Sequence, residues 1–245
     1  MLEGLNSAAA GMAAQQQRLD AVANDLANAN TTGYKHIRVG FRDLVYTQTG
    51  RSSAQGPRTG AGAAAVDAGR GFAQGAVQHT EQPYDVAIQG DGFIRVRLAD
   101  GSQALTRDGS LKVDGAGKLV TSSGAVLQPP ITFPPGIDPS RVSIGPDGTV
   151  LSAGQRVGRI ELVSVRSPQG LQPVGDNAFL ATPESGAVRP APASTTLSQG
   201  ALEMSNVDMA AAMVAMIESQ RAFQLTSKAI QTQDQMWEIA NGVKR

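Results

Sequence analysis

Residues 209–241 read MAAAMVAMIESQRAFQLTSKAIQTQDQMWEIAN, and this stretch decides the class of fold. A strict seven-residue apolar repeat favours a coiled-coil seam over a helix that lies on a globular core. The pattern predicts a helix over about residues 205–241, with Ser205 or Asp208 as its N-cap. The side chains that form the repeat are Met209, Met216, Phe223, Ile230 and Trp237.

A second heptad pattern lies at the opposite end of the chain. Residues 2–30 are rich in Ala, Leu, Met and Gln, which are good helix formers. The pattern predicts a long helix that ends in residues 28–33, where Gly33 suits a left-handed C-terminal position. An ordinary amphipathic helix on a domain surface is the alternative for either helix alone. The positions that recur at three- and four-residue steps are Leu2, Leu5, Ala9, Met12, Gln16, Leu19, Ala23 and Leu26.

The middle of the chain, residues 80–184, has the pattern of short antiparallel strands. Ile94, Val96 and Leu98 alternate with residues that include two arginines, so we expect one face of this strand to be buried. Further strands are expected at residues 86–88, 119–120, 142–144 and 160–165. Asp-Gly between short apolar runs is the strongest short-range hairpin signal. It occurs at Asp91-Gly92, Asp100-Gly101, Asp108-Gly109, Asp114-Gly115 and Asp147-Gly148.

Together these patterns predict an α+β chain. We expect the long terminal helices to pair as a coiled coil, and the central all-β domain to form a small antiparallel barrel or sandwich. Residues 47–71 are dense in Gly, Ala, Ser and Arg, so we expect them to be flexible unless a neighbouring surface orders them. Residues 185–198, rich in Pro, Ala and Thr, are predicted to be a second linker. The predicted layout is 1–46 N-terminal helix and following motif, 47–79 linker and extended stretch, 80–184 β domain, 185–201 linker and 202–245 C-terminal helix.

The composition excludes several classes of function. The 245 residues contain no cysteine, which rules out a disulfide scaffold, a thiolate zinc site and a cysteine nucleophile. The 21 basic and 21 acidic residues give no electrostatic reason to expect a nucleic-acid partner. His36 and His79 lie in no catalytic motif, and residues 60–65 match a loose dinucleotide pattern without the strand it requires. We therefore expect no catalytic residue, cofactor, metal or small-molecule substrate.

The sequence gives no sign of membrane insertion. It has no run of about 18 apolar residues, the length that a membrane-spanning helix needs. Glu3 stands where a secretory signal carries positive charge, and no continuous apolar stretch follows it. We expect the chain to stay inside the cell or to leave it by a route that reads no cleaved signal.

Three motifs resemble those of a known family and occur in the same order as in that family. They read ANDLANANTTGYK (23–35), DVAIQGDGF (85–93) with TRDGS (106–110), and LEMSNVD (202–208) with QRAF (220–223) and SKAIQT (227–232). They resemble the N-terminal signature, the first β domain and the C-terminal signature of bacterial flagellar axial proteins, the family of rod, hook and hook-associated subunits. The three matches together span nearly the whole chain.

The resemblance implies a structural function. The chain is too short for a typical hook subunit, and it is most similar to the distal-rod members, with the proximal-rod members as the near alternative. Such subunits are exported without a cleaved signal and stack helically into a hollow shaft across the periplasm, which transmits torque and conducts exported subunits. The implied partners are further copies of the chain, other rod and hook subunits, the flagellar export apparatus and, depending on the cell envelope, outer ring (bushing) proteins. Residues 47–71 resemble an insertion that lies between neighbouring distal-rod subunits and stiffens the shaft.

The candidate functional residues lie on the terminal helices and in their flanking motifs, where we expect subunits to meet. Helices with such narrow apolar seams are marginal alone in water, so we expect them to fold as they pack against neighbouring chains. One alternative is a membrane- or partner-binding adaptor, although the first helix has one arginine and many glutamines, unlike a membrane-surface helix. Another is an enzyme on a small β scaffold, for which the sequence has no recognisable constellation of residues. The expected interface residues are Leu5, Met12, Leu19, Leu26, Asn28, Gly33 and Tyr34, followed by Asn206, Met209, Met216, Arg221, Phe223, Ile230 and Trp237.

Overall fold

The computed structural model describes residues 2–44, 46–48, 58–134, 136 and 139–242. The chain divides into two compact units, which are described separately below. The first unit comprises residues 1–27, 37–68 and 208–245, and the second comprises residues 28–36 and 69–207. In sequence order, two terminal helices flank a β-rich middle with antiparallel sheets, which confirms the α+β class.

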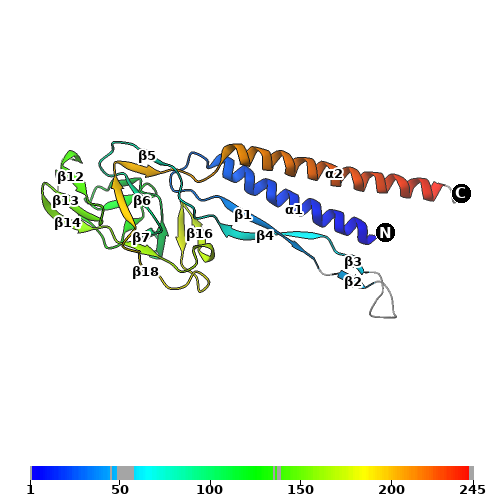
Figure 1. Ribbon diagram of the computed structural model, residues 1–245, viewed down its shortest axis with the longest axis horizontal. Helices are drawn as coiled ribbons and strands as arrows, with labels where there is room; N and C mark the ends of the chain where they lie inside the picture. The colour runs from blue at the N-terminus through cyan, green and yellow to red at the C-terminus, as the bar shows by residue number, and fades with distance from the viewer. Residues whose placement is uncertain (1, 45, 49–57, 135, 137–138, 243–245) are drawn as a thin grey trace. The chain divides into compact units, whose positions relative to one another are not determined.

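The first unit contains the two long helices, α1 (Leu2–Ala27) and α2 (Met209–Gly242). They lie side by side and run in opposite directions (Figure 1), with the guanidinium of Arg18 on α1 3.6 Å from the carboxylate of Glu218 on α2. Asp208 is the N-cap of α2, because its Oδ1 accepts hydrogen bonds from the backbone N–H groups of Ala210 (2.9 Å) and Ala211 (3.1 Å). Of the two predicted N-caps, Asp208 is therefore confirmed.

Two β-ribbons complete the first unit. Strand β1 (Ile37–Asp43) pairs with β4 (Ala63–Arg70), and β2 (Tyr46–Gln48) pairs antiparallel with β3 (Arg58–Gly60). Residues 47–71 were expected to be flexible unless a neighbouring surface orders them, and their strand segments are ordered by backbone pairing and not by large apolar side chains. Close packing also contributes, since a Cβ on Gly62 would lie 2.9 Å from the carbonyl oxygen of Ser7 on α1. Residues 49–57 of that stretch lie outside the described residues.

The second unit is built from short strands. Its largest sheet has the order β16-β17-β8-β7-β11-β10-β9, with β15 paired to β7 and β18 paired to β15. A second sheet has the order β12-β13-β14, and two further pairs are β6 with β19 and β5 with β20. Their closure into a barrel or sandwich stays a prediction. The bounds are β5 Val77–His79, β6 Val86–Gln89, β7 Phe93–Arg97, β8 Gln103–Thr106, β9 Leu111–Val113, β10 Leu119–Thr121, β11 Val126–Leu127, β12 Val142–Ile144, β13 Thr149–Ser152, β14 Gln155–Arg159, β15 Leu162–Ser164, β16 Gln172–Gly175, β17 Ala178–Leu180, β18 Arg189–Pro190, β19 Thr196–Gln199 and β20 Ala201–Glu203, with short 3-10 turns at Pro139–Arg141 and Pro168–Gly170.

The predicted second linker also contains strands. Within residues 185–198, β18 pairs with β15, and β19 begins its pairing with β6. The expectation of a linker there is wrong, because backbone hydrogen bonds to neighbouring strands order a stretch whose composition alone suggested a loop.

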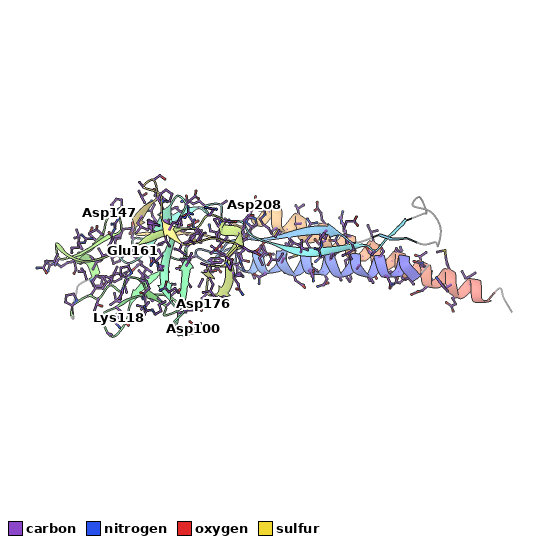
Figure 2. The ribbon with its side chains drawn as sticks, turned by 90° about the horizontal axis from the view of Figure 1, so that it is seen from below. Asp100, Lys118, Asp147, Glu161, Asp176 and Asp208 are labelled. Carbon is purple, nitrogen blue, oxygen red and sulfur yellow. The ribbon has the colours of Figure 1, made fainter. Side chains whose placement is uncertain are left out.

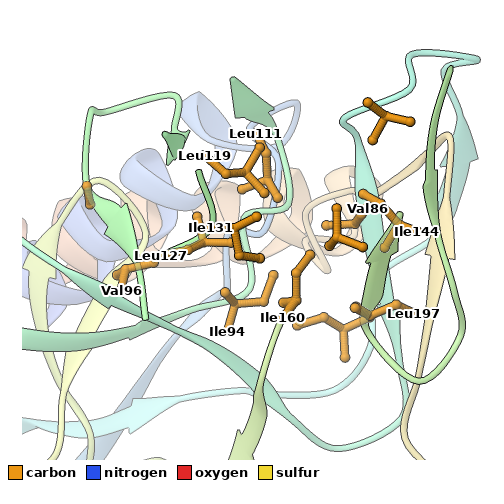
Figure 3. Packing of buried hydrophobic residues seen from close by; sticks show 14 of the residues in the cluster. Val86, Ile94, Val96, Leu111, Leu119, Leu127, Ile131, Ile144, Ile160 and Leu197 are labelled. Atoms are coloured by element: carbon orange, nitrogen blue, oxygen red, sulfur yellow. The ribbon is translucent and has the colours of Figure 1, made fainter. Parts of the chain in front are cut away.

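Apolar side chains from many of these strands form one buried cluster (Figure 3). Val86 on β6, Ile94 on β7, Leu119 on β10 and Leu197 on β19 all belong to it. A smaller cluster gathers Phe93, Leu105, Val163, Val165, Leu171 and Phe179, against which Phe72 packs. Phe93 and Ile94 are consecutive, so β7 is buried on both faces at this end. The prediction of a single buried face is therefore wrong here, because Phe72 and Phe179 cover the second face with edge-to-face ring contacts.

The Asp-Gly pairs have two different functions. Asp100-Gly101 turns between β7 and β8, Asp114-Gly115 between β9 and β10, and Asp147-Gly148 between β12 and β13, as predicted. The hairpin prediction is wrong for Asp91-Gly92 and Asp108-Gly109, because the strands on either side of each pair have other partners. Asp108 instead accepts hydrogen bonds from the hydroxyl groups of Thr32 and Ser122 and from the N–H of Ser110.

Candidate assembly interface

The most buried side chains of the two helices are small or polar. Ala14 on α1 has 3% of its surface exposed, and Ser219 on α2 has 1%. The Ser219 hydroxyl donates to the carbonyl of Ala215 in its own helix (2.8 Å), so this buried polar group is satisfied. The larger apolar side chains of α2 are not among the buried ones.

Those larger side chains are exposed along almost the full length of α2. Leu225 has 70% of its surface exposed and Met213 has 52%. Contiguous exposed apolar surface on a soluble protein marks an interaction site. The exposed set on α2 is Met209, Met213, Val214, Ile217, Phe223, Leu225, Met236, Trp237 and Ile239.

The heptad positions predicted to form the seam divide between two environments. On α1, Leu5, Met12, Leu19 and Leu26 are half-buried, whereas Ala9, Gln16 and Ala23 are exposed. On α2, Met216 and Ile230 are half-buried, whereas Met209, Arg221, Phe223 and Trp237 are exposed. The predicted stripe is therefore not the most buried face of either helix within the single chain. The sequence pattern did not reveal that small residues would take that position.

The predicted residues in the flanking motifs already have partners inside the second unit. Gly33 has a φ of +67°, as expected for a left-handed position, and a Cβ there would lie 2.7 Å from the backbone nitrogen of Asp108. Tyr34 is buried, and the guanidinium of Arg70 lies 5.3 Å from the centre of its ring. Asn28 accepts a hydrogen bond from the hydroxyl of Thr31 (3.1 Å).

Asn206 is the most connected of these residues. Its side-chain oxygen accepts from the N–H of His36 (2.9 Å), and its amide donates to the carbonyls of Gly71 (2.7 Å) and Ala73 (3.0 Å). One side chain thus ties together three segments that are far apart in the sequence. This arrangement gives Asn206 a structural role within the single chain, alongside the expected role in assembly.

Sequence reasoning missed a buried ionic triad in the second unit. Glu203 on β20 accepts from the ammonium of Lys35 (2.6 Å) and from Nε of Arg107 (2.9 Å). The side chains of Lys35 and Glu203 are fully buried, and that of Arg107 is 2% exposed. Burial lowers the pKa of Lys35 from its usual value, and the neighbouring Glu203 carboxylate opposes this effect. A signal was present in the sequence, because each of the three motifs contributes one charged residue.

The exposed carboxylates of the second unit serve its turns. Asp100 and Asp147 lie in hairpin turns (Figure 2). The pKa of Asp100 is lowered by hydrogen bonds from the hydroxyl and N–H of Ser102, and that of Asp147 by the same bonds from Thr149. Within the described residues, no group of three His, Cys, Asp or Glu side chains could hold a metal ion. None of the helices in the described part of the chain is both long and apolar enough to cross a membrane.

Three family models match the chain in consecutive segments. They are the flagella basal body rod protein over residues 5–35, the flagellar hook protein FlgE/F/G D1 domain over residues 87–152, and the flagellar basal body rod FlgEFG protein C-terminal segment over residues 198–243. These matches cover both terminal helices and the first part of the β-rich middle. They define the class as flagellar rod and hook proteins.

Individual relatives narrow the class. The flagellar basal-body rod protein FlgG of Borreliella burgdorferi is 42% identical over 264 residues, and the FlgG of Bacillus subtilis is 36% identical over 268 residues, with both matches covering 100% of each chain. The FlgF rod protein of Caulobacter vibrioides is 36% identical over 224 residues, a match that covers 87% of this chain and 86% of the relative. The chain belongs to the FlgG family of flagellar basal-body rod proteins. It is a structural subunit located in the rod of the flagellar basal body.

Proposed function

We propose that copies of this chain stack helically into the hollow shaft of the distal rod, which transmits torque and conducts exported subunits. The observation that carries the proposal is the set of exposed apolar side chains on α2, between Met209 and Ile239. A single chain leaves these side chains open to water, whereas a polymer would cover them at every subunit. A head-to-tail contact that does not close on itself gives a filament instead of a ring.

The geometry of the proposed contact follows from the two kinds of side chain on the helices. Within one chain the helices bury small residues such as Ala14 and Ser219. Between chains, the half-buried and exposed heptad positions, among them Leu19, Met216 and Phe223, would form coiled-coil seams with the helices of neighbouring copies. Folding of the helices is then completed by assembly, since long helices with narrow seams are marginal alone.

Further partners belong to the same proposal. Other rod and hook subunits would continue the helical stack at its two ends, and the flagellar export apparatus would deliver the chain without a cleaved signal. Outer ring (bushing) proteins would surround the shaft in envelopes that have them. The expected contact with other rod and hook subunits is supported by the family model that matches residues 198–243, because that model describes a C-terminal segment shared by these proteins.

The proposal is tested by placing a charge at one of the exposed apolar positions of α2. Leu225→Asp changes a side chain that is 70% exposed, so the single chain keeps its fold. In cells that lack the native chain, the variant should give no swimming and basal bodies without hook or filament, because a carboxylate buried without a partner strongly opposes every subunit contact. The matched control is Gln235→Asp, an exposed polar position on the same helix, which should restore swimming. Normal flagella with Leu225→Asp would contradict the proposal.

A further inference from the structure

The buried triad consists of a complete ion pair and one added cation. Glu203 and Arg107 form the pair, with Nε of Arg107 2.9 Å from Oε2 of Glu203. Arg107 also donates to the carbonyl of Gly90 (2.9 Å), and its guanidinium lies 5.7 Å from the centre of the Phe93 ring. The second carboxylate oxygen accepts from the N–H of Gly75 (2.9 Å). This neutral, hydrogen-bonded receptor is built entirely from residues 69–207.

Lys35 enters the receptor from a different stretch of chain. Its ammonium donates to Oε1 of Glu203 (2.6 Å) and to the carbonyl of Ala73 (2.7 Å), and its side chain is fully buried. The triad thus holds two cations and one carboxylate. Because a buried charge without a counterion is strongly unfavourable, Lys35 can be buried only while Glu203 is in place.

The other anchors of residues 28–36 also come from elsewhere in the unit. The N–H of Gly33 donates to the backbone carbonyl of Glu203 (2.8 Å), and the N–H of His36 donates to the side chain of Asn206. The carbonyl of Thr32 accepts from the side chain of Asn177 (2.8 Å). The apolar clusters of the unit are drawn from residues 72–197. Within the segment, Tyr34 is buried beside the guanidinium of Arg70. The other described anchors are polar, so we expect the segment to open while the clusters stay closed.

We propose that residues 28–36 are a docking segment that attaches to the second unit as a separate step, and that Glu203 is the residue that permits this docking. The two ends of the contact are 168 residues apart in the chain. One consequence rests on the proposed function, in which the chain is exported through the flagellar channel. During export, the docking segment stays detached until both Lys35 and Glu203 have left the channel.

The test is a double-mutant cycle on the purified full-length chain, read by amide hydrogen exchange. The reporters of docking are the N–H groups of Gly33 and His36, and the reporters of the core are those of β7, β8, β12 and β13. In the native chain, we expect the docking reporters to exchange by a local opening, faster than the core reporters. Glu203→Gln should speed their exchange at least about 100-fold, because an amide cannot balance two buried cations, and should speed core exchange by a smaller factor, because Arg107 also loses its partner.

The cycle isolates the part played by Lys35. In the Lys35→Met background, the same Glu203→Gln change should speed exchange at the docking reporters less than about 10-fold, because the one cation that then loses its carboxylate is Arg107, which belongs to the receptor and not to the docking segment. Lys112→Met removes an exposed lysine from β9 and should leave both sets of reporters unchanged. These measurements need no polymer, so a result that contradicts the docking inference would not contradict the proposed rod function.

Three results would overturn the inference. The first is equal protection of the docking and core reporters in the native chain, which would show that the segment opens only with the whole unit. The second is an equal effect of Glu203→Gln in the two backgrounds. The third is loss of core protection in Lys35→Met, which would show that Lys35 supports the core itself. If Glu203→Gln alone does not fold, the native chain and Lys35→Met still decide the first and the third of these results, either of which overturns the inference.

Discussion

The two units of this chain place their apolar side chains in opposite ways. In the second unit, residues such as Ile94 and Leu119 are almost fully buried within the chain. In the first unit, α2 buries Ser219 and exposes Leu225 and Met213. The β-rich unit therefore buries its large apolar side chains within the single chain, whereas the helical unit leaves many of its own exposed, as the proposed assembly requires.

The largest expected effect would come from a charge on the half-buried seam of α2. We predict that Met216→Asp abolishes shaft formation and swimming while the β-rich unit stays folded. Truncating a buried methionine costs about 2–5 kcal/mol, and an unpaired buried carboxylate adds roughly several more at each subunit contact. Motility assays and electron microscopy of basal bodies measure assembly, and circular dichroism of the purified chain measures the β signal.

Gln235→Asp is the control for this prediction, because Gln235 is exposed on the same helix. Since Met216 is already half-buried in the single chain, some loss of helical signal is compatible with the comparison between the units. Loss of the β signal together with assembly would contradict the view that the β-rich unit folds without the helix contacts.

A smaller effect is expected from a cavity in the β-rich unit. Ile94→Ala removes a side chain that is 1% exposed, and we predict that it lowers the free energy of unfolding of that unit by about 2–5 kcal/mol. Urea denaturation followed by β-sheet circular dichroism provides the measurement. Met236→Ala on α2, where the native side chain is exposed, should change the same quantity by less than about 0.5 kcal/mol. Equal losses in the two variants would show that the helix surface is not reserved for partners.

Removing the cap of α2 should have a weaker effect that is confined to the helical unit. Asp208→Ala deletes the acceptor of two backbone N–H groups, so we predict a loss of about 1 kcal/mol in helix stability. Thermal loss of helical circular dichroism should shift to lower temperature, while unfolding of the β-rich unit does not move. Asp234→Ala, an exposed position within the same helix, is the matched control. A shift in both transitions would indicate that the two units unfold together.

The smallest expected effect is a dependence on pH. Because burial holds the pKa of Lys35 in the folded chain below its ordinary value of 10.5, the unfolded chain binds more protons between these two values. The free energy of unfolding should therefore rise with pH in that window, by less than about 1.4 kcal/mol per pH unit from this group. The charged groups that contact Lys35 are Glu203 and Arg107. Comparison with Lys35→Met isolates the effect, and identical pH profiles for the two proteins would contradict it.

The sequence was sufficient for the features that are periodic or local. Seven-residue spacing identified both helices, and the turn chemistry of Asp-Gly correctly located three hairpins. The same local signal failed at Asp91-Gly92 because strand β6 pairs with β19, more than a hundred residues away, and no local rule contains that pairing. The order in β4 was missed for a similar reason, since its pairing with β1 needs few large side chains.

The candidate interface could be predicted only in part. Large apolar residues at seven-residue spacing can be recognised in a sequence, which is why Phe223 and Trp237 could be singled out. The small residues that bury the helices within the chain, such as Ala14, do not differ from the other alanines in the sequence. Lys35 and Glu203 stand in separate motifs, and only the folded chain shows that they meet.

The triad also restricts how this chain can be recombined with its relatives. A chimera that takes its first forty residues from another rod protein brings its own residue to the position of Lys35, while Glu203 and Arg107 remain in the recipient. A donor with an acidic side chain there would bury two carboxylates beside one guanidinium, and a donor with a small side chain would leave the Ala73 carbonyl with the Asn206 amide but without the ammonium group. The unit of exchange is therefore not the N-terminal helix alone. It is the helix together with the matching residues of the other two motifs.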